Sequence, residues 1–225
     1  MEGKLSNRRV AILVADGFEE SEFEKPFEAV KNEGAQVDVI SLKPGKIKSW
    51  NHKDWGKEYP VDKAISTVNA KDYDALILPG GVMNPDQLRM DADVVSFVSS
   101  FIDKEKPVAA ICHGPWTLIE TGRLKGKTLT SYPSLKTDLI NAGALWVDKE
   151  VVVDGLFITS RNPNDLPAFC QKIIEEFAKD NPNTPQRTAN YFFGFCPSVS
   201  AYFASEPTIF LPPLIDVLLR WSGKS

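Results

Sequence analysis

Cysteine and histidine are scarce in this sequence of 225 residues. It contains three cysteines and two histidines. The cysteines, Cys112, Cys170 and Cys196, are widely spaced and form none of the close Cys or His pairs that are typical of a zinc site. An odd number of isolated cysteines also argues against a disulfide scaffold, so we expect a reducing, cytoplasmic compartment.

Long apolar runs and a charge excess are missing as well. No apolar stretch reaches the roughly 18 residues of a transmembrane helix, and residues 1–13 lack the apolar run of a secretory signal. The net charge is -4 and both signs are interspersed, which argues against nucleic acid as the main partner because a basic face would be expected. Apolar residues make up 43% of the chain, as is ordinary for a protein with a full-sized core.

Short β-branched runs alternate with longer amphipathic runs from residue 9 to residue 180. We expect strands at residues 10–14, 36–40, 75–78, 108–111, 128–130, 151–153 and 156–159. We expect helices at residues 22–34, 94–106, 114–121, 135–142 and 163–179. Apolar strands that alternate with helices predict an α/β domain whose parallel sheet is covered on both faces.

Two segments depart from this rhythm. Residues 43–62 contain two tryptophans, a histidine and several lysines. We interpret them as a loop or small β excursion that serves as a surface flap or subunit contact, or alternatively as a lid over substrate. Residues 181–225 are irregular, aromatic and too apolar for a flexible tail. We expect this C-terminal extension of the 1–180 domain to pack on the domain, meet a partner subunit or touch a membrane surface, unless it is a cloning artefact.

Three loops that follow predicted strands carry unusual residues. They are the acidic loop at residues 16–22, Pro79-Gly80-Gly81, and Cys112-His113-Gly114-Pro115. Ligands of parallel α/β sheets bind beyond the carboxyl ends of the strands. We therefore expect all three loops to face one crevice.

Cys112 lies at a sharp turn from a strand into a helix, which its small neighbours Ala110 and Gly114 permit. A helix N-terminus stabilises a thiolate through its dipole and its free N–H groups, so we expect a lowered thiol pKa. The same logic governs the Gly-x-Ser-x-Gly turn of serine hydrolases. The alternative is a buried structural cysteine. The two other loops favour a nucleophile.

His113 follows the candidate nucleophile directly. It is the candidate base by elimination, because the other histidine, His52, lies in the irregular segment. Adjacent side chains normally diverge, so contact between Cys112 and His113 requires a strained turn. In the alternative, His113 packs at an interface and contributes only its backbone N–H.

The other two loops offer an acid and hydrogen-bond donors. Glu22 opens a predicted helix, and its side chain can point back over the crevice, where burial would raise its pKa and let it donate a proton to sulfur. Glu19 is expected to hold loops together. Gly80 and Gly81 let the backbone approach a ligand and could offer N–H groups to an oxyanion, unless the pair is a simple turn.

Together these motifs resemble the ThiJ/PfpI superfamily. The matching segments, in family order, are Phe18-Glu19-x-x-Glu22, Leu78-Pro79-Gly80-Gly81, residues 110–115, Thr130-Ser131-Tyr132-Pro133 and Ser160-Arg161. Residues 84–89 resemble the PfpI branch and its general-stress relatives. The resemblance covers residues 8–180 and implies a flavodoxin-like three-layer sandwich that assembles as a homodimer or hexamer and needs no metal or cofactor.

The resemblance also implies roles for individual residues. It implies that Cys112 is a nucleophile in a strained turn, that Glu22 is hydrogen-bonded to its sulfur and that His113 is the partner of the nucleophile. In PfpI-type peptidases an acidic residue of a neighbouring subunit completes a triad. The matching residue here is Asp86, which is one methylene shorter. Tyr132 matches a tyrosine near the site, and the extension after residue 180 has no counterpart.

Activities across this superfamily include intracellular peptidase, cofactor-independent glyoxalase and repair of glyoxal adducts on proteins. We therefore expect a cysteine-dependent hydrolase or lyase that acts on a small carbonyl compound, a glycated protein or a peptide in stress protection. Glyoxalase and deglycase chemistry are favoured over proteolysis because they need only an exposed thiolate and an acid. The alternative is a redox-sensing or chaperone-like stress protein without efficient turnover.

Overall fold

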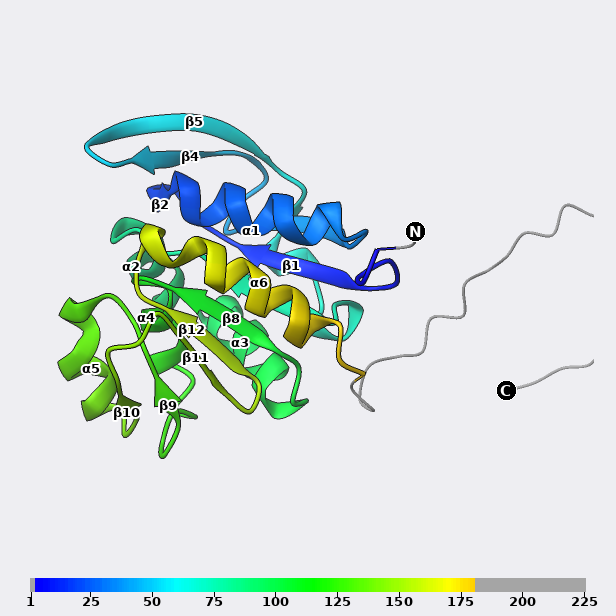
Figure 1. Ribbon diagram of the computed structural model, residues 1–225. Coiled ribbons are helices and arrows are strands. Elements are labelled where there is room, and N and C mark those ends of the chain that lie inside the picture. The colour runs from blue at the N-terminus through cyan, green and yellow to red at the C-terminus, as the bar shows by residue number, and fades with distance from the viewer. Residues whose placement is uncertain (1–2, 181–225) are drawn as a thin grey trace, which may run out of the picture. The chain divides into compact units, whose positions relative to one another are not determined.

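The centre of the protein is a seven-stranded sheet in the order β11-β12-β8-β7-β1-β3-β6 (Figure 1). The structure is a computed structural model, and it describes residues 3–180. The strands are β1 (Arg9–Leu13), β3 (Gln36–Ser41), β6 (Lys63–Ala64), β7 (Ala75–Leu78), β8 (Val108–Ile111), β11 (Val151–Asp154) and β12 (Phe157–Ser160). Only β11 is antiparallel to its neighbour in this sheet, which confirms the predicted parallel α/β arrangement.

Helices cover both faces of the sheet. In Figure 1, α1 (Glu20–Asn32) and α6 (Leu166–Phe177) lie side by side on the near face, while α3 (Ala92–Asp103) lies behind the sheet. The shorter helices are α2 (Met83–Arg89), α4 (Pro115–Ile119) and α5 (Lys136–Asn141). Single 3₁₀ turns are η1 (Ile65–Thr67), η2 (Ala70–Asp72), η3 (Pro133–Leu135) and η4 (Pro163–Asp165). The three layers form the expected flavodoxin-like sandwich.

The core divides into two clusters, one on each face of the sheet. In β1, Ala11 and Leu13 belong to the cluster that includes the buried residues of α3, whereas Val10 and Ile12 belong to the cluster of α1 and α6. Successive side chains of a strand point to opposite faces, so a strand that is apolar throughout serves both clusters. This is why the central strands read as unbroken apolar runs.

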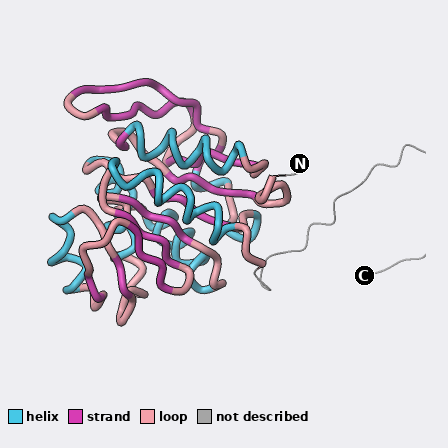
Figure 2. The backbone as a smooth tube through the Cα atoms, viewed as in Figure 1, coloured by secondary structure: helices cyan, strands magenta, loops and turns pink. Residues whose placement is uncertain are grey.

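Residues 43–62 form the small β excursion that the sequence predicts. β4 (Gly45–Asn51) and β5 (Asp54–Val61) pair as an antiparallel hairpin, and β2 (Phe18–Glu19) adds to β4 in parallel. Figure 2 shows the hairpin extending beyond the main sheet, above α1. Its turn contains His52 with a φ of 56°, a left-handed conformation that a non-glycine residue adopts only rarely.

Short elements account for the differences from the sequence prediction. The strands β2, β6 and β10 (Leu145–Trp146) and the helix α2 have two to seven residues, too short for a period to show. β9 (Thr128–Leu129) was predicted, and it pairs with β10 in a separate two-stranded sheet. α1 begins at Glu20, two residues earlier than predicted. The predictions for Cys196 and for the extension at residues 181–225 lie outside the described residues.

Candidate active site

Cys112 lies in a strained turn directly after β8. Its φ is 61°, in the left-handed region. The turn is held on both sides, because the Cys112 N–H donates to Ser160 O at 3.0 Å and the Tyr132 N–H donates to Cys112 O at 2.9 Å. A Cβ on Gly114 would lie only 2.3 Å from Leu78 O, so the chain needs glycine there to enter α4. The strained turn expected at this position is therefore present.

The Glu22 side chain is fully buried beside Cys112. Its Oε2 accepts a hydrogen bond from the Gly80 N–H at 3.0 Å. Its Oε1 is buried, and no hydrogen-bond partner for this atom lies within residues 3–180. Burial raises the pKa of Glu22 to about 8, although the contact with Cys112 opposes the rise. The carboxyl is therefore mostly protonated at neutral pH, as a donor to sulfur must be.

The expectation of a lowered thiol pKa is wrong for this site. Burial of the sulfur raises the pKa of Cys112 above its usual range, and the charge of Glu22 raises it further. The N–H groups of His113 and Gly81 face the sulfur and favour the thiolate, but they do not outweigh burial. α4 has five residues, and so short a helix has too few aligned peptide units for a strong dipole.

Cys112 and Glu22 thus titrate as a pair. The charge on Glu22 disfavours the thiolate only when the carboxyl is ionised, and near neutral pH it is protonated. Loss of the first proton from the pair leaves one negative charge, which can lie on the Glu22 carboxylate or on the Cys112 thiolate. The sulfur is nucleophilic when Glu22 holds the remaining proton.

His113 contacts the sulfur despite being its neighbour in the chain. Its Nδ1 lies 3.2 Å from Cys112 Sγ, and its Nε2 lies 3.1 Å from Ser134 Oγ. The ring stacks on Tyr132 with the centroids 4.8 Å apart. Burial lowers the pKa of His113, so the imidazole is neutral at pH 7. It can accept the thiol proton, but its Nε2 partner within the chain is a hydroxyl that would not stabilise an imidazolium as a carboxylate would.

Comparison with known proteins identifies the family of the chain. A sequence model of the DJ-1/PfpI family matches residues 8–176. The chain belongs to the DJ-1/PfpI family. YraA of Bacillus subtilis, provisionally named a cysteine protease, is 47% identical over 72% of this chain and 94% of its own length. A deglycase from Pyrococcus abyssi is 45% identical over 74% of this chain and 98% of its own. The crystal structure of Drosophila melanogaster DJ-1beta matches with a TM-score of 0.70 and 34% identity, over 77% of this chain and 91% of that one.

The two glycines of this DJ-1/PfpI site do not act alike. The Gly80 N–H is already bonded to Glu22, so it positions the acid instead of waiting for a substrate oxygen. A Cβ on Gly80 would lie 2.5 Å from Glu22 Oε2 and 2.7 Å from Cys112 Cβ. Gly81 has a φ of 79°, and its N–H faces the sulfur. The pair is therefore more than a simple turn.

The acidic loop ties the hairpin to the site. Glu19 ends β2, and its carboxylate interacts with the backbone N–H of His52 at the hairpin turn, as expected for a residue that holds loops together. Burial raises the pKa of Glu19, and its charge in turn contributes to the raised pKa of Glu22. Glu19, which contacts the hairpin turn, therefore lies within electrostatic reach of the acid.

Asp86 is the one predicted catalytic residue that the chain does not bring to Cys112. It is exposed on α2, and no hydrogen bond within residues 3–180 joins it to His113. Its predicted role across a subunit boundary stays a prediction. Tyr132, in contrast, is 42% exposed and lies against His113, so it borders the mouth of the site.

Two side chains at the site were missed by sequence reasoning. Ser134 contacts His113, and its only signal was its position directly after the family motif that ends at Pro133. Asn84 is fully buried and hydrogen-bonds to the loop at Pro79 and Gly80. Its signal was an amide directly before proline in the segment that resembles the PfpI branch.

Neither metal binding nor membrane crossing finds support within residues 3–180. No group of three or more His, Cys, Asp or Glu side chains in this part of the chain is placed to hold a metal ion. None of its helices is long and apolar enough to cross a bilayer. The predicted cytoplasmic location stays a prediction.

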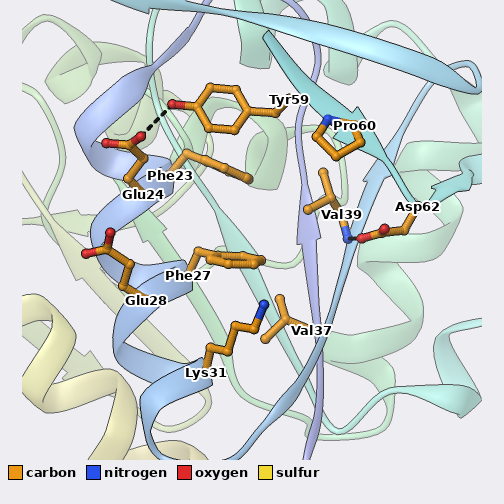
Figure 3. Close-up of a pocket in the computed structure, with 10 residues that line it drawn as sticks. All are labelled: Phe23, Glu24, Phe27, Glu28, Lys31, Val37, Val39, Tyr59, Pro60 and Asp62. Atoms are coloured by element: carbon orange, nitrogen blue, oxygen red, sulfur yellow. Dashed lines mark hydrogen bonds between the residues drawn. The ribbon is translucent and has the colours of Figure 1, made fainter. Parts of the chain in front are cut away.

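A separate hollow lies between α1 and the hairpin. It has a volume of about 420 Å³ and is lined by Phe23, Glu24, Phe27, Glu28, Lys31, Val37, Val39, Tyr59, Pro60 and Asp62 (Figure 3). The Tyr59 hydroxyl donates to Glu24 Oε1 at 2.7 Å. No residue predicted for catalysis lines it, so it is not part of the candidate active site.

Proposed function

We propose that this protein is a cysteine-dependent enzyme that needs no cofactor and removes or converts reactive carbonyl compounds, in the manner of a deglycase or glyoxalase. The substrate class is a 2-oxoaldehyde such as methylglyoxal, or its adduct on a protein. The observation that carries the proposal is the fully buried Glu22 carboxyl beside Cys112, whose pKa burial raises to about 8. The deglycase name of the Pyrococcus abyssi relative supports it.

The chemistry needs only the groups that meet in this site. A bond forms between Sγ and the carbonyl carbon as the π electrons of the C=O bond move onto its oxygen. The reacting state is the pair that has already lost one proton, with the sulfur as thiolate and the remaining proton on Glu22. That proton passes to the carbonyl oxygen, and Glu22 is left as the carboxylate. A carboxyl with a pKa of about 8 can both hold a proton and release it near neutral pH.

Peptide hydrolysis is the second candidate, and the contact of 3.2 Å between Cys112 and His113 favours it. Proteolysis requires a base that becomes positively charged and then protonates the leaving amine. The low pKa of the buried imidazole and its hydroxyl partner oppose that charge. An acidic residue from a second subunit would be needed to reverse this. The redox-sensing or chaperone-like alternative relies mainly on the extension, which lies outside the described residues.

The test is consumption of methylglyoxal by the wild type, Cys112→Ala and Glu22→Gln, with a fluorogenic peptide amide as the second substrate. We expect Cys112→Ala to abolish methylglyoxal consumption. Glu22→Gln keeps the side chain's shape but cannot transfer a proton, so kcat should fall about 100-fold or more. Consumption that survives in Cys112→Ala would refute the proposal. Peptide cleavage that exceeds methylglyoxal turnover and disappears in His113→Ala would favour the peptidase.

A further inference from the structure

Asn84 is a fully buried amide in the first turn of α2. Its Oδ1 accepts a hydrogen bond from the Ala15 N–H at 2.7 Å. Its Nδ2 donates to Pro79 O at 2.9 Å and to Gly80 O at 3.0 Å. Both amide hydrogens and the amide oxygen are therefore used, which fixes the orientation of the side chain.

These hydrogen bonds join two loops of the candidate active site. Ala15 belongs to the loop after β1, which leads to the acidic residues, and Pro79 begins the loop after β7. The loops are in tight contact, because a Cβ on Gly81 would lie 2.4 Å from Gly17 O. A small displacement of either loop therefore moves the other.

The loop that Asn84 holds supplies two contacts to the reacting pair. The Gly80 N–H bonds to Glu22 Oε2, and the Gly81 N–H faces Cys112 Sγ. Asn84 itself contacts neither the sulfur nor the carboxyl. It acts on them only through the backbone of the two glycines.

We propose that Asn84 is a positioning residue for the Cys112 and Glu22 pair, which it sets by clamping the Gly80–Gly81 loop to the end of β1. The expected effect of Asn84 on turnover rests on the proposed function. Its effect on the protonation of the Cys112 thiol does not depend on whether methylglyoxal is the substrate. Loss of the two Nδ2 donors should release the loop. The Gly81 N–H would then move away from the sulfur, and thiolate formation would shift to higher pH.

The test compares Asn84→Asp, Asn84→Ser and a matched control, Gln87→Glu. Asn84→Asp keeps the shape but turns a carboxylate oxygen toward the carbonyls of Pro79 and Gly80. Asn84→Ser removes the donors without adding charge. Gln87 lies on the same helix, and its amide donates to Asp16 O at 2.9 Å and to Met83 O at 3.0 Å, but not to the glycine loop.

The measurement is the rate of iodoacetamide alkylation of Cys112 against pH, with kcat and KM for methylglyoxal alongside. Circular dichroism first establishes that each variant is folded. We expect alkylation in Asn84→Asp to shift by about one pH unit upward, which is a tenfold lower rate at pH 7. Asn84→Ser should shift in the same direction by less, and kcat should fall more than KM rises in both. Gln87→Glu should shift by less than either Asn84 variant, because it removes a hydrogen bond to the acidic loop at Asp16 and leaves the hydrogen bonds of the glycine loop in place.

Wild-type alkylation profiles in both Asn84 variants would show that Asn84 is structural only and would overturn the inference. An equal shift in Gln87→Glu would overturn it too, because the effect would then belong to α2 as a whole. If Asn84→Asp does not fold, Asn84→Ser alone decides. A wild type that consumes no methylglyoxal would refute the proposed function, while the alkylation profiles would still test Asn84.

Discussion

At the scale of single residues, the reactivity of the candidate site depends on the position of one proton, which Cys112 and Glu22 share. Glu22 is shielded from water and held by a single backbone N–H, which is too few donors to keep a buried carboxylate ionised at neutral pH. The same burial raises the pKa of Cys112. The reactivity of Cys112 therefore depends on whether its sulfur or the Glu22 carboxyl holds the proton that they share. It depends less on the acidity of the thiol alone.

The buried carboxyl should make the stability of the protein depend on pH. The pKa of Glu22 is about 8 in the folded state and 4.5 ordinarily, so between these values the folded state holds a proton that the unfolded state has lost. The stabilising effect of this bound proton on the folded state is fully present below the ordinary pKa of the carboxyl. It is lost as pH rises through the pKa that Glu22 has in the folded state. We expect the free energy of unfolding to fall by up to about 1.4 kcal/mol per pH unit across this window.

Urea unfolding of the wild type and of Glu22→Gln from pH 5 to pH 8 checks this. Glutamine is neutral throughout, so the variant should lose most of this slope, and its stability should exceed that of the wild type most clearly at the alkaline end. Parallel pH profiles for the two proteins would mean that Glu22 is ionised in the folded state.

Gly80 should tolerate no side chain. A Cβ there would meet Glu22, the Cβ of Cys112 and the backbone oxygen of Ile111 at 2.5, 2.7 and 2.9 Å, and the backbone oxygen cannot move aside cheaply. We expect Gly80→Ala to lower the free energy of unfolding by about 1–3 kcal/mol and to abolish turnover. Gly122→Ala is the control, because Gly122 has a φ of 67° but open space around it. A loss no larger than in the control would contradict the steric account.

At the scale of elements, two carboxylates of α1, Glu20 and Glu24, hydrogen-bond to the β4–β5 hairpin, and Glu20 makes more of these bonds. Glu20 accepts hydrogen bonds from Ser49 Oγ at 2.6 Å, from the Lys57 N–H at 2.9 Å and from Asn51 Nδ2 at 3.1 Å. Hydrogen bonds to a charged acceptor are stronger than those between neutral groups. Glu20 is therefore the main polar anchor of the hairpin.

Removal of that anchor should loosen the hairpin before the sheet. We expect Glu20→Ala to lower the free energy of unfolding by about 1–3 kcal/mol, because buried donors lose their partner. Amide hydrogen exchange should accelerate in β4 and β5 and remain slow in β1 and β7. Glu28→Ala on the same helix is the control, since Glu28 is exposed and its one ion pair within the described part of the chain is with Lys25 at 3.2 Å. Equal protection of the hairpin in both variants would show that apolar packing holds it.

The elements also show where sequence reasoning succeeds and where it stops. β7 and β8 are four-residue apolar runs followed by glycine or cysteine turns, and local pattern alone predicts both the strands and the position of Cys112. The partners of Asn84 and Ser134 lie on other elements, and a single sequence carries no signal of that packing. The raised thiol pKa was missed for the same reason, because burial is a property of the folded chain.

At the scale of the whole molecule, assembly decides whether Asp86 acts. We expect a homodimer or hexamer in light scattering at micromolar concentration. If a partner's Asp86 completes the site, mixed oligomers of Asp86→Asn and Cys112→Ala should regain activity, because an intact thiol then meets an intact carboxylate. Each variant alone is the control. A fully active monomer, or a mixture no more active than its parts, would remove Asp86 from the mechanism.

The left-handed turn at Cys112 has a consequence for how this chain can change. A non-glycine residue in that conformation destabilises the fold by about 1 kcal/mol, and glycine relieves the strain. Cys112→Gly should therefore abolish activity at less cost in stability than Cys112→Ala, which loses the same thiol and keeps the strain. A descendant that is no longer selected for catalysis can therefore replace the nucleophile by glycine and keep a stable fold. An intact scaffold in a relative is for this reason no sign of retained chemistry.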